Sequence, residues 1–571
     1  MPNKEVVPIV DGVGMFPTRT ELPQAWDDVI RDAFWFTSQG SQMIPYNWFT
    51  WLEQAGSDQL FRTAEHMDAM NYLPMESSST NPSGLPIGFA LDYDKSTGQA
   101  WMGFTCAACH TNQVNYQGTK ILVEGAPTLG NMVMFLNKLL LAMESTSSDD
   151  AKFERFARNV LGDSYSDKTK AALHTALFEQ AEALAERLQI NSVPTPPYPP
   201  DYTSFGRLDA FSNIENAATV FALGDLSNGT LINAPVSYPF LWGTHQSDVV
   251  QWNGAAPNTP LIGPMVRNIG EVVGVFGHLK IDPAHWWEIW QWKDSYTSTV
   301  KFDGLGNLEF WVKDLRSPQW PQDIFPPIDS QLAARGAGLY QTNCSGCHQV
   351  VPRDEEGQIY QAKMISLDII GTDPNMATHA ATNKARTLAL KGKQKLVLFG
   401  GKFGAEAISL DIVANGIVGV ILEDPIAVLE GALITEQDVG ADLTNEESLR
   451  RMTQLLEEHF GPKTDPGISY KARPQNGIWA TAPYLHNGSV PNLWELLQQP
   501  ADRVMTFYVG SREFDPVRVG FSTDQEGNSA LFRVLDDSGQ PISGNSNAGH
   551  TYGTSLIEND KWALIEYMKS L

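Results

Sequence analysis

The four cysteines of this chain occur in two pairs, and a histidine directly follows the second cysteine of each pair. The first motif reads Cys-Ala-Ala-Cys-His and the second reads Cys-Ser-Gly-Cys-His. Two thiols at this spacing can each add to one vinyl group of a haem, and the adjacent imidazole then lies under the iron as an axial ligand. The spacing therefore predicts two covalently bound c-type haems. The expected attachment and proximal residues are Cys106, Cys109, His110, Cys344, Cys347 and His348.

Two other uses of paired cysteines fit the sequence less well. A structural zinc ion takes four nitrogen or sulfur ligands, but residues 110–343 separate the two pairs and each pair is followed directly by histidine. Disulfides stabilise small secreted domains, whereas a chain of 571 residues buries enough apolar surface to fold without them. One haem at each motif accounts for both pairs and for both histidines.

The composition indicates a large acidic globular protein. Hydrophobic residues make up 42% of the chain, which is enough to build buried cores, and the formal net charge is -26. Nucleic acids and anionic membrane surfaces repel an acidic protein that lacks a basic patch, and no run of Lys or Arg occurs in the sequence. We therefore expect no nucleic-acid partner. The apolar stretches at residues 132–143 and 396–434 are too short or carry charges, so no transmembrane segment is expected.

Proline-rich passages divide the chain. Five prolines within residues 191–206 forbid a helix there, and a second proline-rich passage at residues 316–329 marks the best domain boundary. We expect an N-terminal haem domain over residues 1–325 and a C-terminal cytochrome c-like domain over residues 326–571.

Helical patterns dominate both halves. They cover residues 46–70, 149–189 and 558–571, and Asp329 or Ser330 can cap a helix that leads into the second motif. Strand signals are few and short. The sequence thus predicts a mainly α-helical protein with long loops.

The first residues contain no export signal, because they lack a basic region followed by an apolar one. Haem c is nonetheless normally attached outside the bacterial cytoplasm. We therefore expect a periplasmic or secreted protein whose export signal was removed before Met1.

Longer segments resemble the bacterial di-haem cytochrome c peroxidase superfamily, in which two Cys-x-x-Cys-His sites occur in this order. The segments that carry the resemblance are FGRLDAFSNIENA (205–217) and KARPQNGIWATAPYLHNGSVPNLWELL (471–497). Four further segments are similar to its oxygenase branch, which contains rubber oxygenases and fatty-acid dioxygenase and diol-synthase enzymes. These segments are residues 234–254, 265–279, 506–521 and 547–556. The resemblance implies a di-haem peroxidase-like architecture with two cytochrome c-like haem domains.

The resemblance also implies which iron is closed by a sixth ligand. In the rubber oxygenases a histidine near the C-terminus closes the second haem, and NAGHTYGTSL places His550 at that position. Met505 and Tyr508 compete for this role, because they lie nearer to the positions where the peroxidases carry Met and a relative carries Tyr. The other loop histidines that could bind iron are His245, His278, His379 and His486.

The first haem departs from the peroxidase pattern. Typical peroxidases carry a histidine shortly after the first motif, just before an Asn-Ala-Pro-Thr segment, and this histidine closes the resting iron. Residues 124–131, EGAPTLGN, match the segment, yet no histidine occurs between His110 and His174. The resemblance therefore implies an open first iron, which suits O2 binding better than a regulated peroxidase cycle. It also implies that the N-terminal domain carries the oxygen-reactive haem and that the C-terminal domain carries the electron-transfer haem.

A calcium ion between the haems is a further implication that stays open. Gly125 stands where the peroxidases carry an asparagine that helps to hold this ion. Thr481 and Pro483 still match the positions that supply carbonyl ligands, so we expect them to bind calcium if the ion is present.

An oxygenase pocket should be apolar, because its substrate is a hydrocarbon chain. The aromatic residues in the signature loops of the branch are Phe240, Trp242, Trp252 and Phe276. In a chain with 16 Trp and 26 Phe, an ordinary core position is the main alternative for each of them. One tryptophan of the two, Trp252 or Trp242, is also a candidate for electronic coupling between the haems.

Three cations in the family motifs could pair with haem propionates or could form surface ion pairs. They are Arg207, Lys471 and Arg473.

The resemblance implies a haem-dependent dioxygenase that adds O2 at a carbon-carbon double bond of an apolar aliphatic substrate. We favour an unsaturated fatty acid over polyisoprene, because we expect the rubber-cleaving enzymes to be longer chains. Two alternatives stay open, namely a di-haem peroxidase that is reduced by a small redox protein and an electron-transfer cytochrome with both irons closed.

Overall fold

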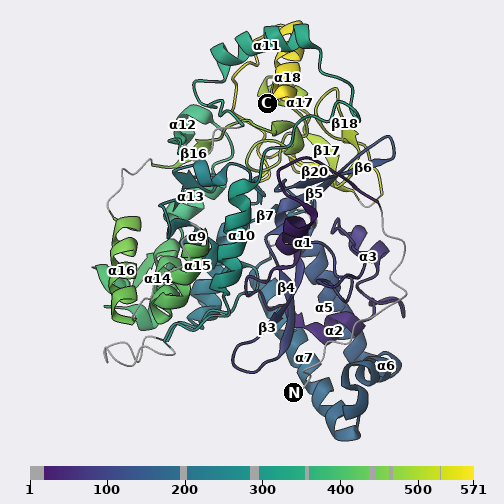
Figure 1. The fold of residues 1–571 in the computed structure, drawn as a ribbon, viewed down its shortest axis with the longest axis vertical. Helices are drawn as coiled ribbons and strands as arrows, with labels where there is room; N and C mark the ends of the chain where they lie inside the picture. The colour runs from purple at the N-terminus through teal and green to yellow at the C-terminus, as the bar shows by residue number, and fades with distance from the viewer. Residues whose placement is uncertain are drawn as a thin grey trace.

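The computed structural model describes residues 18–192, 202–282, 295–353, 359–435, 445–461, 467–527 and 529–571. Helices are the dominant elements of these residues, and the strands form only small sheets of two or three strands. Long irregular segments connect them (Figure 1). The prediction of a mainly α-helical protein with long loops is therefore confirmed.

The first Cys-x-x-Cys-His motif follows a strand directly. β4 (Ala100–Phe104) leads into α4 (Ala107–His110), and β3 (Phe89–Tyr93) pairs with β4 on one side. A Cβ atom on Gly88 would lie 2.1 Å from the backbone nitrogen of Ala108. Only glycine therefore allows the chain before β3 to pass this close to the motif.

A tight hairpin follows the motif. β5 (Thr111–Tyr116) pairs antiparallel with β6 (Thr119–Glu124), and the two-residue turn between them has positive φ angles of 48° at Gln117 and 84° at Gly118. Positive φ at both turn positions matches the right-handed twist of the strands. The hairpin places Glu124 opposite Thr111, directly behind the motif.

Helices of the N-terminal half pack below this region (Figure 1). The predicted helix over residues 149–189 is in fact two helices, α6 (Asp150–Leu161) and α7 (Asp167–Ile190). Gly162, with φ of 48°, ends α6, and the Ser166 side chain starts α7 through a capping box. The predicted helix over residues 46–70 is likewise interrupted, because only α2 (Tyr46–Trp51) and α3 (Ala64–Asp68) form.

A second group of helices lies beside the N-terminal helices (Figure 1). It contains α9 (Gly263–Gly274), α10 (Phe302–Asp314), α14 (Ser409–Glu423), α15 (Pro425–Thr435) and α16 (Asn445–His459). Gly306 and Gly431 let α10 and α15 cross closely, since a Cβ atom on Gly306 would lie 2.2 Å from the Gly431 carbonyl oxygen.

The membrane-spanning potential of the described helices is limited to one bent pair. No single described helix is both long enough and apolar enough to cross a bilayer. The consecutive helices α14 and α15 pass the same criteria only when taken together, and they are bent by 95°.

Two long helices frame the second motif at the opposite end of the molecule (Figure 1). Asp329 caps α11 (Ser330–Asn343), as predicted, by accepting hydrogen bonds from two backbone N–H groups. α11 ends directly at the motif, and α18 (Glu558–Ser570) packs across α11. A Cβ atom on Gly336 would lie 2.0 Å from the Ala563 carbonyl oxygen, so this close crossing requires glycine.

One hydrophobic cluster connects residues from both predicted domains. It contains Trp26 and Leu122 from the first half as well as Trp479 and Leu564 from the second. The two halves thus share buried surface, and the boundary between residues 325 and 326 stays a prediction.

Candidate functional site

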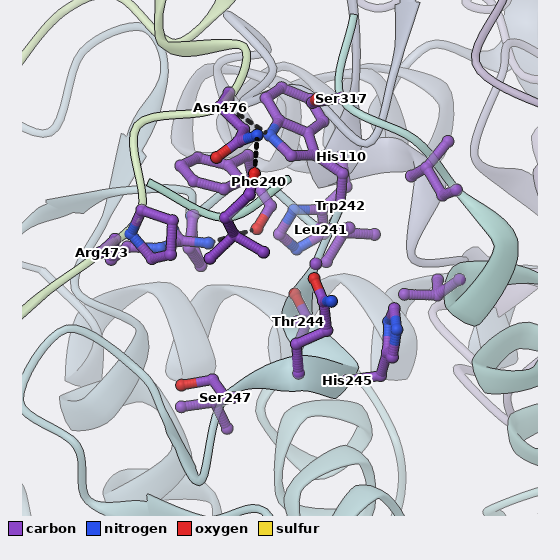
Figure 2. A pocket seen from close by; sticks show the side chains of 18 of the residues that line it. His110, Phe240, Leu241, Trp242, Thr244, His245, Ser247, Ser317, Arg473 and Asn476 are labelled. Carbon is purple, nitrogen blue, oxygen red and sulfur yellow. Dashed lines mark hydrogen bonds between the residues drawn. The ribbon is translucent and has the colours of Figure 1, made fainter. Parts of the chain in front are cut away.

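A cavity lies beside the first motif and has an empty volume of about 1190 Å³, including space open to solvent. We call it the first cavity. Its wall is formed by Cys106 and His110, by the loop at residues 239–247, and by side chains of α9 and α10. Figure 2 shows His110, Leu241 and Trp242 close together on one side of it.

Three of the four predicted aromatic residues line the first cavity. The Phe240 and Trp242 rings stack at a centroid distance of 4.7 Å, and the indole N–H of Trp242 donates to the Asn476 carbonyl oxygen at 2.7 Å. Figure 2 shows this bond as a dashed line. Phe276 does not line this cavity. It packs instead against Arg187, whose guanidinium carbon lies 4.2 Å from the centre of the Phe276 ring.

The first cavity also has a charged side, which the sequence reasoning missed. Arg267 forms an ion pair with Glu309, and the amide of Gln251 donates to Glu271 at 2.8 Å. Burial raises the pKa of the Glu271 carboxyl, and the charge of Arg267 acts against this shift. The wall of the first cavity is therefore partly charged, whereas the sequence predicted an apolar pocket. A signal was present, since Arg267 and Glu271 are four residues apart in an apolar segment and so share one helix face.

The surroundings of His110, the histidine of the first motif, favour its neutral form. Burial lowers the pKa of His110 to about 4, while the backbone carbonyl of Pro239 opposes the shift. Its ring lies 6.2 Å from that of Tyr238. A neutral imidazole is the form that binds a metal.

A second cavity, with an empty volume of about 1390 Å³ including open space, lies beside the second motif. Cys344, Cys347, His348 and His550 all line it. The Nδ1 atom of His348 lies 2.7 Å from the Arg473 carbonyl oxygen and 2.7 Å from the Gln475 amide nitrogen. Because these two groups occupy Nδ1, Nε2 is the ring nitrogen that is left to bind iron.

The rings of His348 and His550 lie close together in the wall of this cavity, at an interplanar angle of 46°. Their centroids are 6.0 Å apart. An iron bound to both Nε2 atoms at about 2.0 Å would place the ring centres about 6.4 Å apart. Burial lowers the pKa of His550 to about 3, and the nearby His348 and Arg503 lower it further. The residues of the second cavity therefore fit a haem with two axial imidazoles.

Met505 and Tyr508, the competing ligands, do not line the second cavity. His486 does line it, with its ring stacked on Tyr470 at a centroid distance of 4.0 Å. Of the other loop histidines, His245 lines the first cavity, whereas His278 and His379 line neither.

Four side chains belong to the walls of both cavities. They are Phe240, Trp252, Lys471 and Arg473. Trp252 is therefore the indole between the two motifs, and its N–H donates to the Ser237 carbonyl oxygen at 2.8 Å. Trp242, in contrast, lines the first cavity but not the second.

Arg473 is the best-placed cation for haem propionates. Its guanidinium lies 3.5 Å from the centre of the Phe240 ring and donates to the Phe240 carbonyl oxygen at 2.7 Å, as drawn in Figure 2. Its Nη1 atom is buried without a hydrogen-bond partner among the described residues. Burial lowers the pKa of Arg473 to about 10. A buried N–H donor that lacks a hydrogen-bond acceptor fits a propionate carboxylate of a bound haem.

Arg207 lies elsewhere. Its guanidinium donates to the carbonyl oxygens of Tyr202 and Asn487 and to the Asn545 side chain, and it lines neither cavity. Thr481 and Pro483 line the second cavity. Within the described ranges no group of three or more His, Cys, Asp or Glu side chains is arranged to hold a metal ion, and calcium binding stays a prediction.

Comparison with known proteins gives matches over a segment and over the whole chain. Residues 469–508 match a family described as RoxA-like, cytochrome c-like. The uncharacterized protein y4iJ of Sinorhizobium fredii (strain NBRC 101917 / NGR234) is 30% identical over 610 residues, which cover 97% of this chain and 93% of the relative. The uncharacterized protein y4iM of the same strain is 26% identical over 287 residues, which cover 50% of this chain and 49% of the relative.

The matched cytochrome c-like segment coincides with much of the second cavity. It contributes Lys471, Arg473, Thr481, Pro483 and His486 to the wall. A cytochrome c-like segment at this place implies that the chain binds haem c.

Proposed function

This chain belongs to the family of protein y4iJ and carries a RoxA-like cytochrome c segment, and from this premise we propose that it is a di-haem c-type oxygenase. The contrast between the two cavities supports this proposal most directly. His348 faces a second imidazole, that of His550, whereas the ring contacts of His110 within the described residues include Tyr238 but no histidine.

Because of this contrast, we assign different roles to the two sites. A c-type haem with an open axial position supplies oxygen or peroxide chemistry, and one with two protein ligands passes electrons. The His110 site is the reactive one on this basis. The His348 site serves as electron reservoir, and Trp252 lies in the wall between the two.

Residues of the first cavity would receive the substrate. Phe240, Trp242 and Trp252 present aromatic surface that excludes water and packs against a hydrocarbon chain. We propose that the enzyme adds O2 at a carbon-carbon double bond of an aliphatic chain. An unsaturated fatty acid is the first substrate to test and polyisoprene is the second. We place this reaction in the periplasm or outside the cell, where haem c is normally attached.

The charged side of the first cavity favours a second candidate, a di-haem peroxidase. Cleavage of peroxide requires a group that moves a proton between the two oxygen atoms. Glu271 is half-buried in the wall of the first cavity and accepts a hydrogen bond from Gln251, so its other oxygen can carry a proton. Burial raises the pKa of this carboxyl, which favours the protonated form.

The test compares three reactions. O2 uptake and product mass are measured with an unsaturated fatty acid and with polyisoprene, and peroxide consumption is measured with a reduced small cytochrome c. Transfer of oxygen atoms from O2 to an alkene supports the oxygenase, whereas oxidation of the cytochrome by H2O2 supports the peroxidase. Inactivity in all three assays together with two low-spin irons contradicts both.

The Glu271→Gln variant separates the two candidates further. Loss of a proton-transfer group should lower peroxide turnover by about 10²- to 10⁴-fold, whereas O2 uptake with an alkene should stay nearly unchanged. Glu124→Gln is the matched control, because burial also raises the pKa of the Glu124 carboxyl, which lies outside the wall of the first cavity.

A further inference from the structure

Arg503 is a buried arginine that the haem motifs do not account for. It follows η8 (Pro500–Asp502) and is only 3% exposed. On one side its guanidinium donates to the Leu496 and Gln498 carbonyl oxygens, both at 3.2 Å. These bonds anchor Arg503 to the end of α17 (Leu493–Leu496).

On its other side, Arg503 binds the segment that carries His550. Its Nη1 atom donates to the Asn547 carbonyl oxygen and, at 3.0 Å, to that of Gly549. Its Nη2 atom donates to the His550 carbonyl oxygen at 3.1 Å. One guanidinium thus binds three carbonyls within four consecutive residues.

The same segment is held from a second direction by α12 (Leu367–Ile370). The His550 backbone N–H donates to the Ile370 carbonyl oxygen at 2.8 Å. The Gly549 backbone passes so close to this helix end that an added Cβ atom would lie 2.4 Å from the same oxygen. The loop is therefore enclosed between Arg503 and α12.

The backbone of His550 needs this support. Its φ angle is 46°, in the left-handed region that residues other than glycine rarely adopt. Such a conformation persists only where the surroundings impose it. The hydrogen bonds from Arg503 and to Ile370 fix both backbone polar groups of His550.

We propose that Arg503 is the positioning residue for the sixth ligand of the second haem. Its guanidinium holds residues 547–550 so that the His550 ring faces His348 and stays there. This inference rests on the proposed function, in which His550 closes that iron. A ligand held in this way leaves the iron slowly, so external ligands are excluded from the second haem and oxygen chemistry is confined to the first.

An arginine is needed because of its donor geometry. The guanidinium carries five N–H donors in a fixed plane, and the bonds described above reach carbonyls on two separate segments. A lysine keeps the charge but has a single rotating ammonium group that cannot reach both segments at once. Arg503→Lys therefore removes the fork and preserves the charge.

The experiment measures how fast cyanide binds to the second haem in the oxidised full-length protein. Binding to a six-coordinate iron requires the internal ligand to leave first. Loss of one or two charged hydrogen bonds should raise this rate about tenfold to a hundredfold in Arg503→Lys. Arg62→Lys is the matched control, because Arg62 is equally buried and donates to the Thr50 and Ser83 carbonyl oxygens, far along the chain from His550.

The His550→Ala variant separates failure of this inference from failure of the proposed function. If the spectrum of His550→Ala stays low-spin, His550 does not bind the iron, and the proposed ligation is wrong. If His550→Ala becomes high-spin but Arg503→Lys binds cyanide at the rate of Arg62→Lys, the positioning role is wrong. If the Arg503→Lys protein does not accumulate, the cyanide-binding rate of Arg503→Gln is compared with that of Arg62→Lys. The same rise of about tenfold to a hundredfold is expected.

Discussion

Replacing Gly549 with alanine should release His550 from the second haem. Gly549 has a φ angle of 71°, and a Cβ atom there would lie 2.3 Å from the Gly371 carbonyl carbon and 2.4 Å from the Ile370 carbonyl oxygen. Both neighbours are backbone atoms, which cannot rotate away as a side chain can. The Gly549 segment therefore has to move as a whole.

The size of the effect follows from two contributions. A left-handed φ angle costs a non-glycine residue about 1–2 kcal/mol. Overpacking against a fixed neighbour adds about 1–3 kcal/mol. Since about 1.4 kcal/mol changes an equilibrium tenfold, the clash alone should reduce the population of the closed loop by roughly 5- to 150-fold.

Gly553→Ala is the matched control for this prediction. Gly553 has a φ angle of 75°, but a Cβ atom there would meet only leucine side chains, of which the nearest atom is 3.3 Å away on Leu497. This variant bears the same cost of the left-handed conformation and avoids the backbone clash. Thermal unfolding should show it slightly destabilised with its haem spectrum unchanged.

Absorption and electron paramagnetic resonance spectra provide the assay. Gly549→Ala should convert the low-spin signal of the second haem to high-spin, with unchanged covalent haem content. Equal spectra for the two alanine variants and the native protein would refute the reasoning, because the loop would then tolerate a side chain that the packing forbids.

Three further outcomes are expected. The denatured protein should exceed its polypeptide mass by two haems, with none extracted by acid-acetone, and a mass excess of one haem contradicts the assignment of both motifs. Burial raises the pKa of Glu124 from 4.5 to about 7, so its protonated form stabilises the fold below pH 4.5 and this contribution is lost as the pH rises to 7. Urea unfolding of Glu124→Gln at pH 5 and pH 8 should therefore show a flatter pH dependence than the native protein by up to about 3 kcal/mol, and parallel curves count against the shift. Phe240→Asp should lower substrate turnover with haem content intact, because a carboxylate beside Arg473 brings water into the first cavity. Full turnover in this variant would show that the reaction does not depend on an apolar wall at this position.

Local sequence signals predicted the parts of the site that depend on neighbouring residues. The Cys-x-x-Cys-His spacing and the Asp329 cap are of this kind, since their geometry is contained within a few residues. The facing pair of His348 and His550 came instead from a resemblance between sequences, because nothing local links residues so far apart.

Other parts of the site depend on tertiary packing and could not be predicted. The ion pair of Arg267 with Glu309 forms only where α9 and α10 meet. Phe276 carries the same local signal as Phe240, yet it packs under Arg187 rather than at the first cavity. Arg503 acts on backbone carbonyls, and these leave no pattern of side chains in the sequence.

The electron paramagnetic resonance spectrum of the untreated, oxidised protein tests the central claim most directly, because it counts the open irons. In the protein with two haems by mass, we expect one high-spin signal from the His110 haem and one low-spin signal from the haem between His348 and His550. Two low-spin signals would contradict the account, since both irons would then be closed by protein ligands and no site would remain for oxygen.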